Sequence, residues 1–197
     1  MARCYSVPVP NRQPPLPDIW LVSDQRNDTM LERVLSHLPR GNGLIFRHYH
    51  LPHGERRARF AALARHARRY GHRAILSGST QEARRWGADG VYGAPGSLKR
   101  GGAILRIVTV HSLRELSAAH RARADAVVIS PVFPTRTHPT ARTLGAVRFR
   151  LLAARTRAPV IALGGMTAKL ARHMGGVKWA AIQGLAKPPT GMFPLHS

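Results

Sequence analysis

The chain has 197 residues and one cysteine, so it suits one domain with a sizeable core and excludes an internal disulfide framework. Its 31 lysines and arginines against 9 acidic residues give a formal net charge of +22, which favours anionic partners. There is no apolar run near the ~18 residues of a membrane span and no apolar leader region. We therefore expect a cytoplasmic protein with no membrane partner.

Residues 1–17 contain five prolines and no periodicity, which predicts an extended N-terminal arm before a single domain over 18–197. Short apolar segments then recur, of the kind that forms strands buried on both faces. These segments are 19–22, 44–46, 74–76, 89–92, 105–108, 126–129, 159–163 and 179–182. Helical patterns lie between them: one capped by Asp28 or Thr29, then 55–70, 80–86, 112–121, 147–155 and 167–174.

Strands that alternate with helices imply right-handed βαβ units and a parallel sheet. About eight strands close a (β/α)8 TIM barrel, so the predicted class is α/β. After the last strand only residues 183–197 remain, with three prolines, so the final helix is expected to be short or missing. The N-terminal arm or a partner subunit would then shield that side, and we favour a homodimer.

The segment 130–145, SPVFPTRTHPTARTLG, follows the buried strand 126–129 and is too rich in proline to be a strand or a helix. Its hydroxyl groups on Thr135 and Thr137, with His138 and neighbouring arginines, suit an anionic ligand. A proline-stiffened connector with solvated basic residues is the alternative.

In a parallel barrel the loops after the strands build the active site. Gly164 and Gly165 lie between a strand and a helix, where backbone N–H groups can approach an anion, and Gln183 and Gly184 would follow the neighbouring last strand. Together they predict a phosphate site. The alternative is that the glycines serve only a tight turn.

The segment 47–53, RHYHLPH, permits a zinc interpretation, but an anion clamp by Arg47 fits the polarity better. His111 and His138 could transfer protons near neutral pH, and a structural role is favoured for His111. No Ser-His-Asp or Cys-His-Asp arrangement, Walker loop or GxGxxG motif is evident, and so few acidic residues make a magnesium site difficult to assemble.

With these pieces in order, the sequence resembles the thiamine phosphate synthase/TenI family from Ile19 to about Leu185. The matching segments are IWLVSD, IFRHY, WGADGVYGAPGSL, VTVHSLREL, SPVFPTRTHPTARTLG, PVIALGGMT and AAIQG. The resemblance implies a (β/α)8 barrel of thiamine biosynthesis. It places Thr135, Thr137, Gly165 and the Gln183-Gly184 backbone at the thiazole phosphate. It also places Arg47 at the pyrophosphate and Thr109 near the pyrimidine.

The family's magnesium and lysine positions hold different residues here: Tyr49, Ser77-Gly78, Ser97 and His138. We therefore expect no metal or other cofactor, and a phosphorylated thiazole or related phosphate ester as ligand. An enzyme is favoured, either a TenI-like tautomerase or a synthase-like transferase, with His138 or His48 as the titrating group. Pro131, however, stands where the TenI histidine is expected.

The alternative function is a non-catalytic protein that binds phosphometabolites or nucleic acid on a degenerate enzyme scaffold. Its polyanion face would be the arginines between Arg56 and Arg69. Nucleic acid is the less favoured partner, because basic surfaces are usually just solvated.

Overall fold

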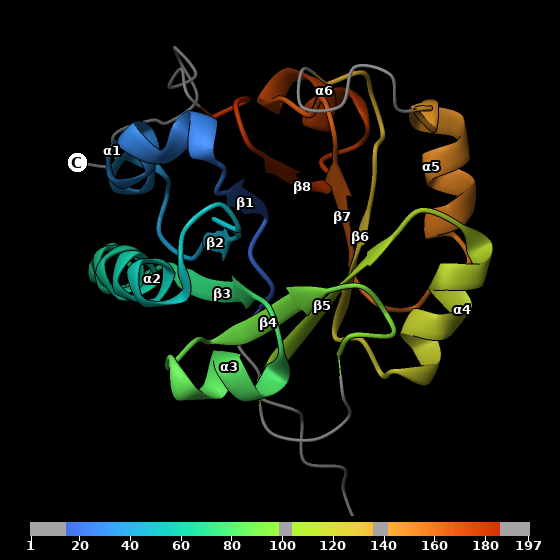
Figure 1. The fold of residues 1–197 in the computed structure, drawn as a ribbon. Coiled ribbons are helices and arrows are strands. Elements are labelled where there is room, and N and C mark those ends of the chain that lie inside the picture. Colours follow the sequence, from blue (N-terminus) through green and yellow to red (C-terminus); the bar gives the residue numbers. More distant parts are fainter. Residues whose placement is uncertain (1–14, 99–103, 136–141, 186–197) are drawn as a thin grey trace, which may run out of the picture.

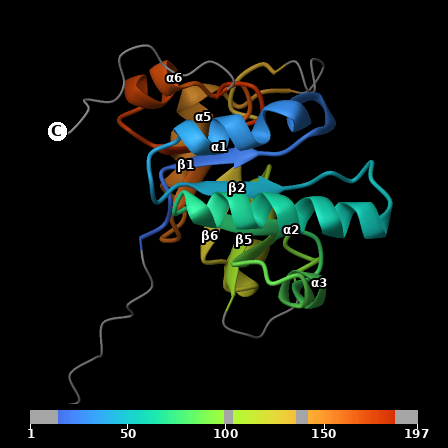
Figure 2. The same ribbon diagram turned by 90° about the vertical axis from the view of Figure 1, so that its left-hand side faces the viewer.

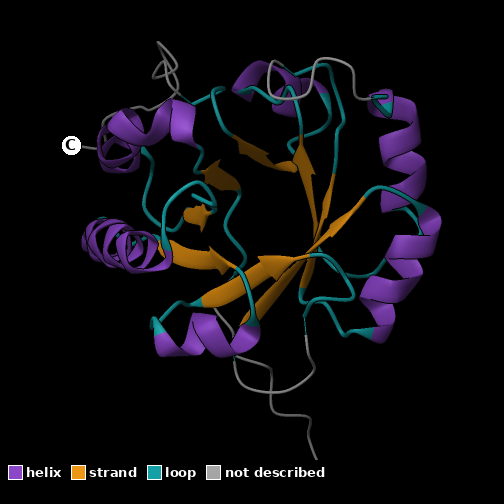
Figure 3. Ribbon diagram, viewed as in Figure 1, coloured by secondary structure: helices purple, strands orange, loops and turns teal. Residues whose placement is uncertain are grey.

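The computed structural model describes residues 15–98, 104–135 and 142–185. Eight parallel strands pair in chain order, and the last pairs with the first, so the sheet closes into a barrel (Figure 1). Helices surround the strands (Figure 3). The predicted (β/α)8 TIM barrel is confirmed.

The strands lie close to their predicted ranges. They are β1 (Ile19–Val22), β2 (Gly43–Phe46), β3 (Arg73–Ser77), β4 (Gly90–Gly93), β5 (Leu105–Val110), β6 (Ala126–Ile129), β7 (Val160–Leu163) and β8 (Lys178–Ala181). The helices are η1 (Gln25–Met30), α1 (Leu31–His37), α2 (His53–Arg69), α3 (Thr80–Arg85), α4 (Leu113–Arg121), α5 (Gly145–Ala153) and α6 (Ala168–His173). No helix follows β8 up to residue 185, and the rest of the segment predicted to lack a full final helix, residues 186–197, lies outside the described residues.

The first helical segment begins earlier than predicted, because Asp24 and not Asp28 or Thr29 is its cap. The Asp24 side chain accepts the N–H of Arg26 at 3.2 Å, and the Asn27 side chain accepts the N–H of Asp24 at 2.8 Å. This reciprocal capping starts the 3-10 helix η1, which runs directly into α1. Figure 2 shows α1 and α2 lying alongside β1 and β2.

Two apolar layers form the core. Alternate strand residues fill the barrel interior, among them Trp20, Ile45 and Ile161, while the others pack under the helices. The indole of Trp20 lies against Gly43, where an added Cβ would be 2.3 Å from its ring atoms. Gly43 is therefore needed for the large side chain of Trp20 to fit inside the barrel.

The chain entering β1 is tied to the barrel at Leu16 and Pro17, whose carbonyls accept hydrogen bonds from the Lys178 Nζ at 3.0 Å and the Trp20 indole N–H at 3.1 Å. The rest of the predicted arm, residues 1–14, lies outside the described residues. Among the helices that are described, none combines the length and the apolar character needed to cross a membrane.

Candidate functional site

A cavity of about 840 Å³ opens at the carboxyl ends of the strands, where parallel barrels carry their active sites. Predicted site residues from the carboxyl ends of five different strands line this cavity. Those that line it are Arg47, Thr109, Thr135, Gly164, Gly165, Gln183 and Gly184. Thr137 and His138, the other members of the predicted loop site, lie outside the described residues.

Three glycines let the β6 loop and the β7 and β8 ends approach one another at van der Waals distance. Gly164 and Gly165 have φ values of +99° and +61°, a region that side chains disfavour. A Cβ on Gly165 would lie 2.5 Å from the Pro134 carbonyl oxygen, and one on Gly184 would lie 2.3 Å from that of Met166. The glycines thus serve a tight turn and also bring backbone to the cavity wall, while the phosphate site stays a prediction.

The β6 loop is held on β7 by backbone hydrogen bonds. The N–H of Val132 donates to Leu163 at 2.9 Å, and that of Phe133 donates to Gly164 at 3.0 Å. Thr167 caps α6 by accepting the N–H of Leu170 at 3.3 Å. This side of the cavity is therefore a cradle made of backbone, which we call the glycine cradle: Gly164, Gly165 and Gly184.

His111 also lines the cavity, and its tautomer is set by its surroundings. Its Nδ1 lies 2.6 Å from the carbonyl oxygen of Ser130, so this nitrogen carries the hydrogen and donates it. Nε2 then carries the lone pair. The backbone N–H of His111 donates to Glu115 at 2.6 Å, and Ser112 caps α4 as predicted. His111 thus combines the structural role expected for it with a place at the cavity.

The opposite side of the cavity is built from Arg47 and Tyr49, which follow β2, and from Tyr92 in β4. Arg47 and Tyr49 line it, and both also line a smaller neighbouring cleft of about 340 Å³. The Tyr49 hydroxyl is hydrogen-bonded to the Ser77 hydroxyl, and the Arg47 guanidinium lies 5.7 Å from the Tyr49 ring centre. Burial raises the pKa of Tyr92, which also contacts the cavity, so its hydroxyl stays neutral.

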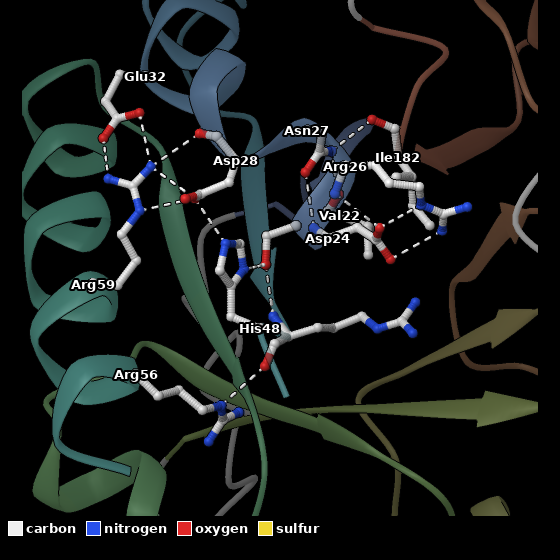
Figure 4. A network of polar contacts seen from close by, with 12 residues as sticks. Val22, Asp24, Arg26, Asn27, Asp28, Glu32, His48, Arg56, Arg59 and Ile182 are labelled. Atoms are coloured by element: carbon white, nitrogen blue, oxygen red, sulfur yellow. Dashed lines mark hydrogen bonds and ion pairs between the residues drawn. The ribbon is translucent and has the colours of Figure 1, made fainter. Parts of the chain in front are cut away.

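His48, a predicted titrating residue, does not line the main cavity. It is 1% exposed, and its ring points toward Asp28 (Figure 4). Its Nδ1 is 2.8 Å from the Ser23 hydroxyl, and its Nε2 is 2.7 Å from the Asp28 carboxylate. Burial lowers the pKa of His48 and outweighs the hydrogen bond to Asp28. The ring is therefore neutral at neutral pH.

This arrangement is a Ser-His-Asp group that sequence reasoning missed. His48 lies 25 residues after Ser23 and 20 after Asp28, and the usable signal is the pairing of β1 with β2, which brings the residues after each strand together. It does not constitute a nucleophilic site, since Ser23 is 0% exposed and its Oγ accepts the N–H of Arg47 at 2.8 Å.

All nine acidic residues of the chain lie in the described residues, and none lines the main cavity. Instead, most of them pair with basic side chains. The pairs are Asp18–Lys178, Asp24–Arg26, Asp28–Arg59, Glu32–Arg59, Glu82–Arg56, Asp89–Arg68 and Asp125–Arg106. Across the described ranges no three His, Cys, Asp or Glu side chains gather where a metal ion could be held.

The arginines of α2 divide into two groups. Arg56 is 8% exposed and donates to the carbonyl oxygens of Arg47 and Ser77, while Arg59 bonds Asp28 and Glu32. Arg57, Arg65 and Arg69 are exposed. Arg56 and Arg59 are therefore engaged in internal contacts and do not belong to an exposed polyanion face.

The chain falls in the class of parallel (β/α)8 barrels, with a cavity at the carboxyl ends of the strands that is lined by the glycine cradle, an arginine and a histidine. Within that class, residues 19–185 match the family model described as thiamine monophosphate synthase. The chain belongs to this family.

The chain is also similar to individual proteins and solved structures. The chain is 36% identical over 59 residues to "Putative thiamine-phosphate synthase 2" of Aquifex aeolicus, a match covering 30% of this chain and 32% of that protein. The thiamine phosphate pyrophosphorylase from Pyrococcus furiosus superimposes with a TM-score of 0.70 at 24% identity, covering 87% of this chain and 88% of that one. The enzyme of that name from Bacteroides thetaiotaomicron gives 0.56 at 14% identity, covering 92% and 90%. These structures share the fold.

Proposed function

We propose that the cavity binds a phosphorylated thiazole or a closely related phosphate ester, and does so without magnesium. The observation that carries this proposal is the makeup of the lining: backbone from the glycine cradle, the hydroxyl of Thr135 and the cation of Arg47, with no carboxylate. Backbone N–H groups, hydroxyls and arginine are the usual protein partners of phosphate oxygens. Membership of the thiamine monophosphate synthase family supports the thiazole as the attached group.

Magnesium does not fit the residues present. Mg²⁺ is bound in proteins through one or two carboxylates together with phosphate oxygens of the substrate. The two acidic residues nearest in the chain to the β1 end of the barrel, Asp24 and Asp28, are engaged by Arg26 and Arg59. We therefore assign the neutralisation of ligand charge to Arg47 and the backbone, with no step through a metal.

Proton transfer is the chemistry that these residues support. With Nδ1–H committed to the Ser130 carbonyl, His111 can accept a proton at Nε2 from one ligand atom and return it to another. His111 takes this role in place of His48, whose ring does not line the cavity. His138 stays a prediction.

Thermal unfolding with thiazole phosphate, in EDTA and in magnesium, tests the proposal. We expect stabilisation of the same size in both buffers, because binding to the folded state alone raises its stability by mass action. Arg47→Ala should reduce the shift, whereas Arg65→Ala, which removes an exposed arginine of α2, should not. No shift with either thiazole phosphate or thiamine phosphate would refute the proposal, as would a shift that requires magnesium.

A further inference from the structure

We propose that His48 is a positioning residue: through Ser23 it fixes the backbone of Arg47, and so determines where the Arg47 guanidinium meets an anionic ligand. This inference rests on the proposed function, because anion binding by Arg47 is what the arrangement serves. The sequence suggested a titrating role for His48, and the structure points to a role through hydrogen-bond direction.

Arg47 needs side chains to hold its backbone because β2 ends just before it, at Phe46. Its N–H donates to the Ser23 hydroxyl oxygen at 2.8 Å, and its carbonyl oxygen accepts from Arg56 Nε at 3.0 Å. The next residue, His48, has a φ of +36°, which turns the chain out of the strand. The backbone of Arg47, which lines the cavity, is thus held by a hydrogen bond at its N–H and another at its carbonyl oxygen.

The directions of these hydrogen bonds allow one arrangement. Burial would raise the pKa of Asp28, but hydrogen bonds from Arg59 and His48 outweigh burial and keep its pKa below the usual value. The carboxylate therefore accepts from His48 Nε2–H, which leaves Nδ1 as an acceptor for the Ser23 hydroxyl hydrogen. The Ser23 oxygen then presents its lone pairs to the N–H of Arg47.

These hydrogen-bond directions require a neutral His48 ring. A proton added at Nδ1 would turn that nitrogen into a donor, and the hydroxyl hydrogen of Ser23, which is 0% exposed, would lose its acceptor. The charged groups facing His48 are Asp28 from η1, Arg59 from α2 and the nearby His50. Phe46 stacks on the ring at 4.7 Å and 8°, which fixes its plane.

Two substitutions of His48 separate its two hydrogen bonds. His48→Asn keeps an acceptor near the Nδ1 position and tolerates positive φ, so it should retain the bond from Ser23. His48→Gln extends a donor toward Asp28 but leaves Ser23 without its acceptor. If His48 only supported the fold, the two variants would differ in stability. The folded form of each would then bind the ligand with the same affinity.

The affinity for sulfate, a divalent anion over the whole working pH range, is the readout, measured by calorimetry on the full chain at pH 7.5. We expect Arg47→Ala to weaken binding about tenfold, and Ser23→Ala and His48→Gln about threefold, with His48→Asn close to the unsubstituted chain. The double variant Ser23→Ala/Arg47→Ala should be no weaker than Arg47→Ala alone. Arg65→Ala controls for loss of general positive charge.

Two results would overturn the inference while leaving the proposed function intact: a tenfold effect of Arg47→Ala with no effect of Ser23→Ala, or effects of Ser23→Ala and Arg47→Ala that simply add. If Arg47→Ala itself leaves sulfate affinity unchanged, the anion-binding role of Arg47 fails, and the inference fails with it. Ser23→Ala keeps the test available if His48→Gln does not fold.

Discussion

The two sides of the cavity are built in different ways. On the β6–β8 side, Gly164, Gly165 and Gly184 bring backbone segments close together at the cavity wall, beside the side chain of Thr135. On the β1–β2 side a chain of side-chain hydrogen bonds and ion pairs, from Glu32 through Arg59, Asp28, His48 and Ser23, ends at Arg47. The first side depends on close packing without side chains, and the second on charge and hydrogen-bond direction. Different changes should therefore break them.

The largest effect is expected in the glycine cradle. Gly165→Ala places a Cβ against the Pro134 carbonyl and forces an unfavourable positive φ, so we expect a loss of about 3 kcal/mol in the free energy of unfolding. Gly87→Ala is the matched control, because Gly87 has a φ of +69° but no atom within 4 Å of an added Cβ. It should cost about 1 kcal/mol. Urea unfolding measures both, and equal losses would show that the close approach is unimportant.

A smaller effect is expected on the side-chain side. Arg59→Ala removes the partner of Asp28 and Glu32 and should lower the free energy of unfolding by about 1.5 kcal/mol. Arg65→Ala, an exposed arginine on the same helix, should change it by less than about 0.5 kcal/mol. If both variants unfold at the same urea concentration, the ion pairs of Arg59 contribute nothing measurable.

The smallest effect is a dependence of stability on pH. Burial lowers the pKa values of His48 and His72 from their ordinary 6.5, so the unfolded chain binds protons that the folded chain excludes. Their contribution is complete above pH 6.5 and is lost as pH falls below it, with a slope of up to about 1.4 kcal/mol per pH unit for each group. The slope between pH 6.5 and 5 should decrease in His48→Asn. An unchanged slope would contradict the neutral, buried state of His48.

The sequence was sufficient for the barrel and for the glycine cradle because both follow from local patterns. Buried strand segments recur at barrel spacing, and paired glycines mark a close backbone approach. It was insufficient for the side-chain network, since the partners of His48 are set by the neighbouring strand and by η1. The cap at Asp24 was missed for a related reason, because it depends on Asn27. The Asn27 side chain accepts the N–H of Asp24 and also donates to the carbonyl oxygens of Val22 in β1 and Ile182 after β8.

Some predictions remain predictions. The homodimer, the phosphate role of Thr137 and the proton-transfer role of His138 belong to this group, the last two because their residues lie outside the described ranges.

The central claim, binding of a phosphate ester without a metal, is tested most directly by calorimetric titration of thiazole phosphate into the chain in EDTA and again in excess magnesium. We predict one site with the same dissociation constant in both buffers, weakened about tenfold by Arg47→Ala. An absence of binding in EDTA, with binding restored by magnesium, would contradict the account.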